Sequence, residues 1–150
     1  MSVGEFCNRA VVVANAATDV ATIARLMREH HVGDVVVVDD TDPARVVPQG
    51  ILTDRDIVLE LVATGVALER VTAGDVMSAD LVTAGEQDSL WQTLNRMRSF
   101  GVRRMVVVNG AGGLEGILTL DDVIELLADE LAALAKIPLH GREREKSRRG

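Results

Sequence analysis

Residues 50–57 read Gly-Ile-Leu-Thr-Asp-Arg-Asp-Ile, and residues 116–123 read Gly-Ile-Leu-Thr-Leu-Asp-Asp-Val. Both stretches follow the pattern Gly-Ile-Leu-Thr-x-x-Asp-[Ile/Val]. In each, apolar residues typical of a strand give way to a hydroxyl and a carboxylate, which suit the first turn of a helix. We therefore expect two strand-to-helix junctions of the same kind, and the repeat predicts two copies of one structural unit.

The similarity between the two halves extends well beyond this motif. Val20, Met27 and residues 35–38 match Leu90, Met97 and residues 105–108, each 70 positions later. Each half reads as β-α-β-β-α. One such unit cannot bury both faces of its sheet, so we expect an α+β fold with the two units packed sheet to sheet around a pseudo-two-fold axis.

Hydrophobic patterning gives the expected elements and their ends. A helix should begin after Thr18 or Asp19 and end at a C-cap glycine, Gly33. A second helix should begin after Asp88 or Ser89, and a last helix should run from Leu120 until Pro138 ends it. The expected strands are residues 10–14, 34–38, 46–52, 81–83, 103–108 and 114–118, of which residues 34–38 should be buried on both faces.

Composition excludes several classes of protein. No apolar run approaches the roughly 20 residues that span a bilayer, and polar residues interrupt any signal-peptide core, so a cytoplasmic protein is expected. A single cysteine, Cys7, allows neither an internal disulfide nor a cysteine-based zinc site. The net charge is −7 despite a basic segment at residues 142–149, and an acidic body disfavours binding to nucleic acid.

Two interpretations of the repeated motif are open from the residues alone. Thr53 with Asp56, and Thr119 with Asp122, approximate helix capping boxes, which need no ligand. The same groups beside the free N–H groups of a helix start could hold a sugar phosphate. Arg55 would add a planar donor suited to phosphate.

The duplicated units resemble a tandem pair of cystathionine-β-synthase-type (CBS) domains, also called a Bateman module. The resemblance rests on the repeated motif, on Asp-Val-Met-Ser at residues 75–78 followed by Leu-Val-Thr at 81–83, and on residues 102–108. It covers about residues 5–135. The units would span residues 5–66 and 80–137, with a linker at 67–79 and a charged, disordered tail at 138–150.

The resemblance implies a regulatory module that binds an adenosyl ligand, such as AMP, ADP, ATP or S-adenosylmethionine, in clefts between the units. Such a module would require no cofactor and would act in energy sensing. It would form a homodimer through its helices and would signal in trans to an effector protein. By the same resemblance, threonine and aspartate hold ribose, an isoleucine flanks adenine, and basic residues meet phosphate. The nucleotide-binding residues would be Ile51, Thr53, Arg55, Asp56, Arg103, Arg104, Ile117, Thr119 and Asp122.

The two halves are not equivalent in charge. Gly33 and Asp34 occupy the positions that match Arg103 and Arg104, and Asp121 stands where the first motif has Arg55. Carboxylates near a phosphate are costly. We therefore expect one cleft to bind a phosphorylated ligand well and the other to bind it weakly or to bind an uncharged ligand.

Three rival functions remain open at this stage. No nucleophile–base pair or metal cluster indicates an enzyme, and no catalytic or metal-binding residues are predicted. A structural dimerisation module would use the motif only as helix caps. A DNA-associated regulator would depend on the basic tail alone.

Overall fold

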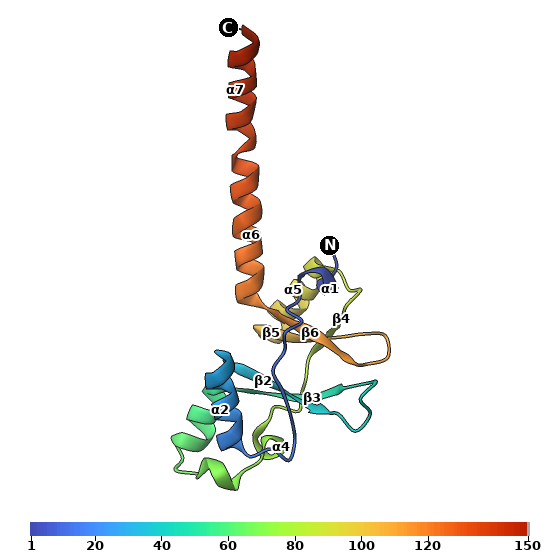
Figure 1. Cartoon of the computed structure of the whole chain (residues 1–150), viewed down its shortest axis with the longest axis vertical. Coiled ribbons are helices and arrows are strands. Elements are labelled where there is room, and N and C mark those ends of the chain that lie inside the picture. Colours follow the sequence, from blue (N-terminus) through green and yellow to red (C-terminus); the bar gives the residue numbers. More distant parts are fainter. Residues whose placement is uncertain (150) are drawn as a thin grey trace. The chain divides into compact units, whose positions relative to one another are not determined.

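The computed structural model describes residues 1–149 (Figure 1). The chain divides into two compact units, Met1–Leu118 and Thr119–Gly150. The first unit holds nearly all of both β-sheets and the helices that cover them. The second unit holds the last two helices.

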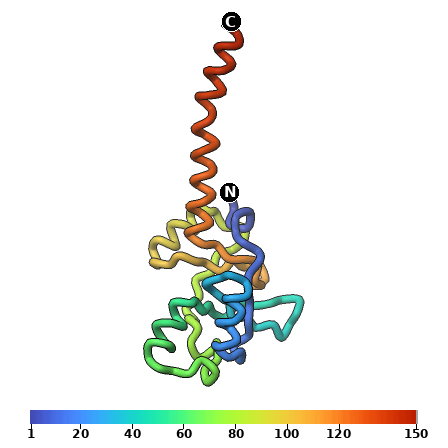
Figure 2. Tube along the Cα trace, turned by 60° about the vertical axis from the view of Figure 1, so that its left-hand side comes forward, coloured from blue at the N-terminus to red at the C-terminus, as the bar shows by residue number. Residues whose placement is uncertain are grey.

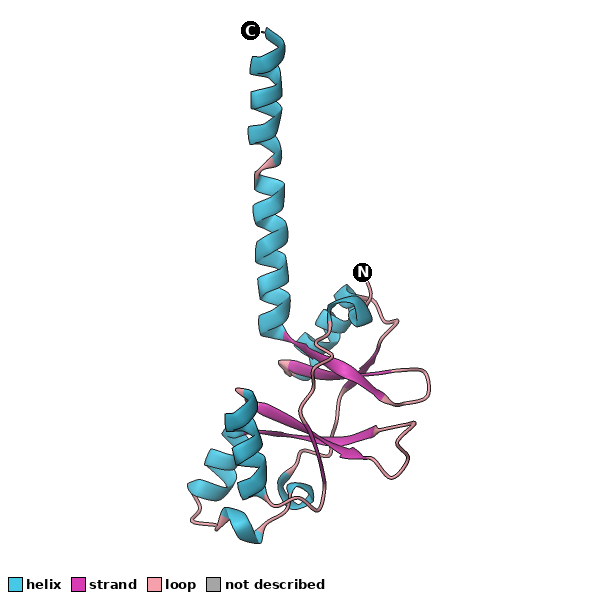
Figure 3. Ribbon diagram, in the orientation of Figure 1, coloured by secondary structure: helices cyan, strands magenta, loops and turns pink. Residues whose placement is uncertain are grey.

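Two three-stranded sheets form the first unit, shown in magenta in Figure 3. In the first sheet, β1 pairs in parallel with β2, and β2 pairs antiparallel with β3. The second sheet repeats the order β4-β5-β6, with β4 parallel to β5. The α+β prediction is therefore confirmed. The strands are β1 (Val13–Asn15), β2 (Asp34–Asp39), β3 (Val47–Thr53), β4 (Thr83–Gly85), β5 (Arg104–Val108) and β6 (Leu114–Thr119).

One long helix follows the first strand of each sheet. Helix α2 (Val20–His30) begins with Asp19 as its N-cap, whose carboxylate accepts a hydrogen bond from the Thr22 N–H at 3.0 Å. Helix α5 (Leu90–Phe100) has Ser89 as its N-cap. Shorter helical turns follow β3: α3 (Asp54–Asp56), a π-helix (Ile57–Val62) and a 3₁₀-helix (Leu68–Arg70).

The expected C-cap at Gly33 is wrong. Helix α2 ends at His30, and His31 adopts the left-handed conformation with φ 54°. Gly101 fills the same role after α5, with φ 65°. The cap therefore lies two residues before Gly33, and the sequence pattern missed it because a positive φ is uncommon for any residue other than glycine.

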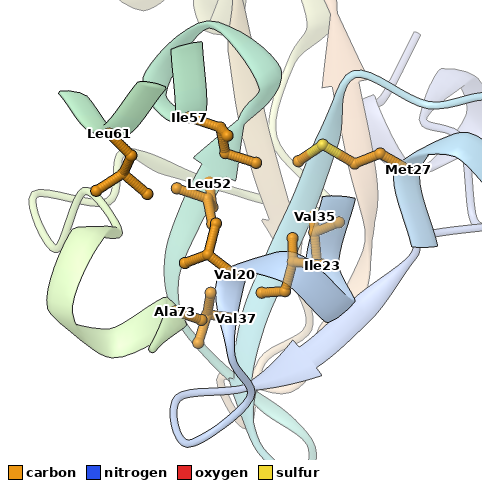
Figure 4. Close-up of a cluster of buried hydrophobic side chains, with 9 residues drawn as sticks. All are labelled: Val20, Ile23, Met27, Val35, Val37, Leu52, Ile57, Leu61 and Ala73. Carbon is orange, nitrogen blue, oxygen red and sulfur yellow. The ribbon is translucent and has the colours of Figure 1, made fainter. Parts of the chain in front are cut away.

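The core of the first half lies between α2, the first sheet and the turns that follow β3 (Figure 4). Strand β2 is buried on both faces, as predicted, because Val35 and Val37 face this core while Val36 and Val38 face the other way, toward Val106 of β5. The two sheets thus pack against each other through valines. The side chains in Figure 4 are Val20, Ile23, Met27, Val35, Val37, Leu52, Ile57, Leu61 and Ala73.

The segment before each half docks on the opposite half. Helix α1 (Val3–Phe6) lies beside β4, where the Gly4 N–H donates to the Glu86 carbonyl at 2.8 Å. Helix α4 (Ala73–Val76) lies beside β1, where the Gly74 N–H donates to the Ala16 carbonyl at 2.9 Å. In Figure 2 the blue N-terminal segment runs from one half of the first unit to the other before the chain continues into α2. This exchange ties the two halves together.

Both docking helices begin with a capping box. Ser2 with Glu5 caps α1, and Thr72 with Asp75 caps α4. The backbone N–H of Ser2 lowers the pKa of Glu5, and hydrogen bonds from Thr72 lower the pKa of Asp75, because each bond favours the charged carboxylate. Stability gained from these caps therefore depends on both carboxylates being ionised.

The second unit consists of α6 (Leu120–Ala135) and α7 (Ile137–Arg149). Helix α6 ends at Ala135, with Lys136 as its C-cap, just before Pro138, as the sequence predicts. A separate helix then begins at Ile137, and Pro138 lies in its first turn, where proline costs no helical hydrogen bond. One expectation needs correction. Where the sequence predicts a disordered tail at 138–150, the structure has a helix to Arg149, and Gly150 lies outside the described residues. Nowhere in residues 1–149 is a helix both long and apolar enough to cross a bilayer.

Candidate functional site

A cavity of about 260 Å³ opens in the first unit, between the end of β3, the loop before β4 and the start of β5. Half of the lining residues are apolar, which suits a flat heterocycle. The others carry two hydroxyls, a carboxylate and two guanidinium groups. The lining residues are Ile51, Thr53, Ser78, Asp80, Leu81, Val82, Val102, Arg103, Arg104 and Val106.

Thr53 stands at the junction where β3 turns into α3. Its Oγ1 accepts a hydrogen bond from the Asp56 N–H at 3.1 Å, while Asp56 Oδ2 accepts one from the Thr53 N–H at 3.0 Å. This reciprocal capping box fixes both side chains at the start of the helix. Thr53 also lines the cavity. Capping thus positions a polar group at the wall of the pocket.

The loop before β4 is pinned to β3 through the backbone. Ile51 and Ser78 exchange two hydrogen bonds, of 3.3 and 3.0 Å. This approach needs Gly50, because a Cβ there would lie 2.8 Å from the Ser78 carbonyl oxygen and 2.6 Å from the sulfur of Met77. The glycine of the motif therefore brings Ser78 and Asp80 to the cavity.

Arg104 and Asp34 form an ion pair across the two sheets. Arg104 Nε lies 3.0 Å from Asp34 Oδ2. The two residues stand at matching positions, 70 apart, at the starts of β5 and β2. Two arginines facing each other here would repel, whereas arginine and aspartate attract. The difference in charge between positions 34 and 104 therefore also produces an ion pair that links the two sheets.

Four of the nine predicted site residues line this cavity: Ile51, Thr53, Arg103 and Arg104. Asp56 lies next to it through its bonds to Thr53 and lines a different depression, together with Glu60 and Asp75. The side chain of Arg55 is exposed on α3.

The three residues of the second motif copy lie at the end of β6 and the start of α6. Ile117 is buried, and it exchanges two backbone hydrogen bonds of 2.9 Å with Asn8. In the second unit, the Asp122 N–H donates to Thr119 Oγ1 at 3.2 Å, which caps α6. The backbone of Asn8 therefore pairs with Ile117 in the same way as the backbone of Ser78 pairs with Ile51.

Sequence reasoning missed Ser78, Asp80 and Val102 as members of the cavity lining. The only sequence signal for this loop was Met-Ser at residues 77–78 followed by Leu-Val-Thr at 81–83. This order indicates that the loop lies near the first copy of the repeated motif, but it does not show which side chains line the cavity. Residues 1–149 bring together no group of three or more histidine, cysteine or acidic side chains that could hold a metal ion.

Comparison with known proteins identifies the fold family. The sequence model of the CBS domain matches residues 3–63 and again residues 73–129. The chain belongs to the CBS domain family. It carries two CBS domains in tandem, as the sequence resemblance predicted. A CBS domain protein of Pyrobaculum aerophilum, solved in complex with AMP, superposes with a TM-score of 0.71 at 26% identity, over 81% of this chain and 89% of that one.

Relatives in sequence cover most of the CBS pair. An uncharacterized protein of Methanopyrus kandleri is 35% identical over 84% of this chain, which spans 62% of that protein's length. Hypoxic response protein 1 of Mycobacterium tuberculosis is 30% identical over 83% of this chain and 84% of its own length.

Proposed function

We propose that this CBS pair is a regulatory module whose cavity beside Thr53 binds an adenosyl ligand and that ligand binding is signalled to an effector protein in trans. The observation that best supports this proposal is the composition of the cavity lining. Apolar side chains, two hydroxyls, the Asp80 carboxylate and two guanidinium groups line a cavity of about 260 Å³. An adenosine phosphate has the matching parts: an apolar base, a sugar diol and an anion.

Each part of the ligand has a counterpart among the lining residues. Ile51 and the apolar residues of the lining would contact the base. Thr53 and Asp56, held at the helix start by the capping box, would accept and donate hydrogen bonds at the ribose. Arg103 and Arg104 would meet the phosphate through charge-assisted hydrogen bonds, and Arg104 also holds its ion pair with Asp34.

The asymmetry between the halves favours one strong site per chain for a phosphorylated ligand. Gly33 and Asp34 stand where the other half has Arg103 and Arg104. Without guanidinium groups, that half offers a phosphate no charge-assisted hydrogen bond from these positions. The AMP complex of the Pyrobaculum aerophilum relative supports an adenosine monophosphate as the first ligand to test.

Thermal unfolding in the presence of AMP, ADP, ATP, S-adenosylmethionine and NAD tests the proposal. A ligand at 100 times its dissociation constant should stabilise the fold by about 2.7 kcal/mol. Guanosine phosphates at the same concentrations carry the same ribose and phosphate and are the control for recognition of the adenine base. If no adenosyl compound shifts the unfolding temperature, the module has another function, and the helix caps are then the sole role of the motif.

A further inference from the structure

The cavity beside Thr53 contains one charged group that has no part in the contacts proposed above, the carboxylate of Asp80. Within residues 1–149 this carboxylate has no hydrogen bond and no ion pair. Asp56 and Asp75 differ from it, because each is held in a capping box at the start of a helix. The Asp80 side chain is therefore available to act on a ligand.

The loop that contains Asp80 does not need a carboxylate in order to form. The segment around Asn8 docks on β6 through the same pair of backbone hydrogen bonds as the segment around Ser78 makes with β3. Two residues after Asn8 comes Ala10, and two residues after Ser78 comes Asp80. Because the matching segment docks in the same way with alanine, the carboxylate has no necessary role in the fold.

The exposure of the lining residues distinguishes the mouth of the cavity from its interior. Ser78, Asp80 and Arg103 are exposed, whereas every apolar lining residue is half-buried or buried. The cavity volume of about 260 Å³ is below the roughly 300–1,000 Å³ of pockets that enclose a drug-sized ligand. A base with its ribose would therefore fill the interior, and a chain of phosphates would extend to the mouth, where Asp80 lies.

The charges around the cavity limit how much negative charge a ligand can bring. Arg103 and Arg104 supply two positive charges. Asp80 in the lining and Asp34 in the ion pair with Arg104 supply two negative charges, so these four side chains sum to zero. One phosphate can form charge-assisted hydrogen bonds with the guanidinium groups. Each further phosphate adds repulsion from the carboxylates.

We propose that Asp80 restricts this cavity to nucleoside monophosphates, because its carboxylate repels the β- and γ-phosphates of di- and triphosphates. This inference rests on the proposed function, since it requires an adenosine phosphate in the cavity. It adds the side chain that sets how many phosphates the ligand carries. A module with this selectivity responds to AMP in the presence of ATP.

Calorimetric titration of the full-length chain with AMP and with ATP, at low salt and with a chelator present, measures the selectivity. The wild type should bind AMP at least about 10-fold more tightly than metal-free ATP. Asp80→Asn should raise the affinity for ATP about 10-fold and the affinity for AMP only about threefold, because metal-free ATP carries about two more negative charges than AMP.

Asp40→Asn is the matched control, because it removes the same charge from an exposed aspartate outside the cavity lining. Strand β2 begins with Asp34, and Asp40 follows its opposite end, about 20 Å away along the strand. The control should change the affinity for either nucleotide by less than about twofold.

Two results with the chelator present would overturn the inference. One is a wild type that binds ATP more tightly than AMP. The other is an Asp80→Asn variant with the selectivity of the wild type, and in that case the proposed function would stand because AMP still binds. If neither nucleotide binds, the proposed function fails and this inference fails with it.

A second titration with magnesium tests the opposite role of the same carboxylate. Asp80 could hold the metal of a magnesium–ATP complex, since Mg²⁺ is commonly bound by one or two carboxylates together with phosphates. Repulsion predicts that Asp80→Asn binds magnesium–ATP at least as tightly as the wild type does. A gain in ATP affinity on adding magnesium that Asp80→Asn abolishes would overturn the inference.

Discussion

The two halves of the CBS pair share their backbone contacts but differ in the side chains placed on them. Asn8 docks on Ile117 and Ser78 docks on Ile51, in each case through two backbone hydrogen bonds. Yet at the starts of β2 and β5 the matching residues are Asp34 and Arg104, which attract each other. Duplication thus repeats the framework, while a few substitutions decide which half can bind an anion.

The helices that follow the two motifs also differ. After Asp56 the chain forms a π-helix, Ile57–Val62, whereas after Asp122 it continues as a regular α-helix to Ala135. π-helical turns are frequent at functional sites, where they adjust the direction of nearby groups. The irregular helix directly follows Asp56, one of the residues proposed to hold ribose.

The largest expected effect concerns the charge difference itself. Arg103→Gln should weaken AMP binding by about 10- to 100-fold, because a hydrogen bond to a charged group contributes about 1.5–3 kcal/mol. Binding of adenosine, which has no phosphate, should change little. Isothermal titration calorimetry measures both affinities.

Arg98→Gln is the matched control for this prediction. Arg98 is an exposed arginine of α5 outside the cavity lining, so its loss should leave AMP affinity within about twofold. Equal losses for Arg98→Gln and Arg103→Gln would mean that only the overall charge of the chain matters.

The second-largest expected effect tests the backbone contacts that the two halves share. Gly50→Ala and Gly116→Ala should each destabilise the fold by about 1–3 kcal/mol, because the added Cβ would lie 2.8 Å from the Ser78 carbonyl oxygen in one case and 2.7 Å from the Asn8 carbonyl oxygen in the other. Urea unfolding measures the loss. Gly110→Ala, with no atom within 4 Å of the added Cβ, should stay within about 0.5 kcal/mol of the wild type. Tolerance of alanine at position 50 would contradict the pinned loop.

A smaller effect concerns a buried hydroxyl in the second half. Thr93 is fully buried, and its Oγ1 has no hydrogen-bond partner among the described residues, whereas Ile23 fills the matching position of the first half. Thr93→Val should therefore stabilise the fold by about 1 kcal/mol. Thr22→Val is the contrasting control, because it removes a 2.7 Å hydrogen bond to Asp19 and should destabilise the fold. A loss of stability in Thr93→Val would show that this hydroxyl is satisfied.

The smallest effect is the pH dependence of the two docking helices. The pKa values of Glu5 and Asp75 are lowered in the folded chain, so the stability they contribute is present above their unfolded values, near pH 4, and is lost as the pH falls through the folded values. The unfolding temperature should drop between about pH 5 and pH 3. The double variant Glu5→Gln/Asp75→Asn should show a shallower drop, and an unchanged slope would mean that other carboxylates control acid unfolding.

Much of this architecture could be predicted from the sequence, because the hydrophobic pattern and the repeat act over many residues. The order of elements and the buried strand at Val35 to Val38 follow from that pattern. Local exceptions could not be predicted. His31 caps a helix in a conformation uncommon for residues other than glycine, and a further helix, α7, begins at Ile137 with Pro138 in its first turn. The place of Asp80 in the cavity depends on a loop held by long-range backbone bonds.

Calorimetric titration of the wild-type chain with AMP tests the central claim most directly, since it gives both affinity and the number of sites. The account predicts one strong site per chain, and Arg103→Gln should remove most of its affinity. Two sites of equal affinity on each chain would contradict it, because the half with Gly33 and Asp34 would then bind the phosphate as well as the half with the two arginines.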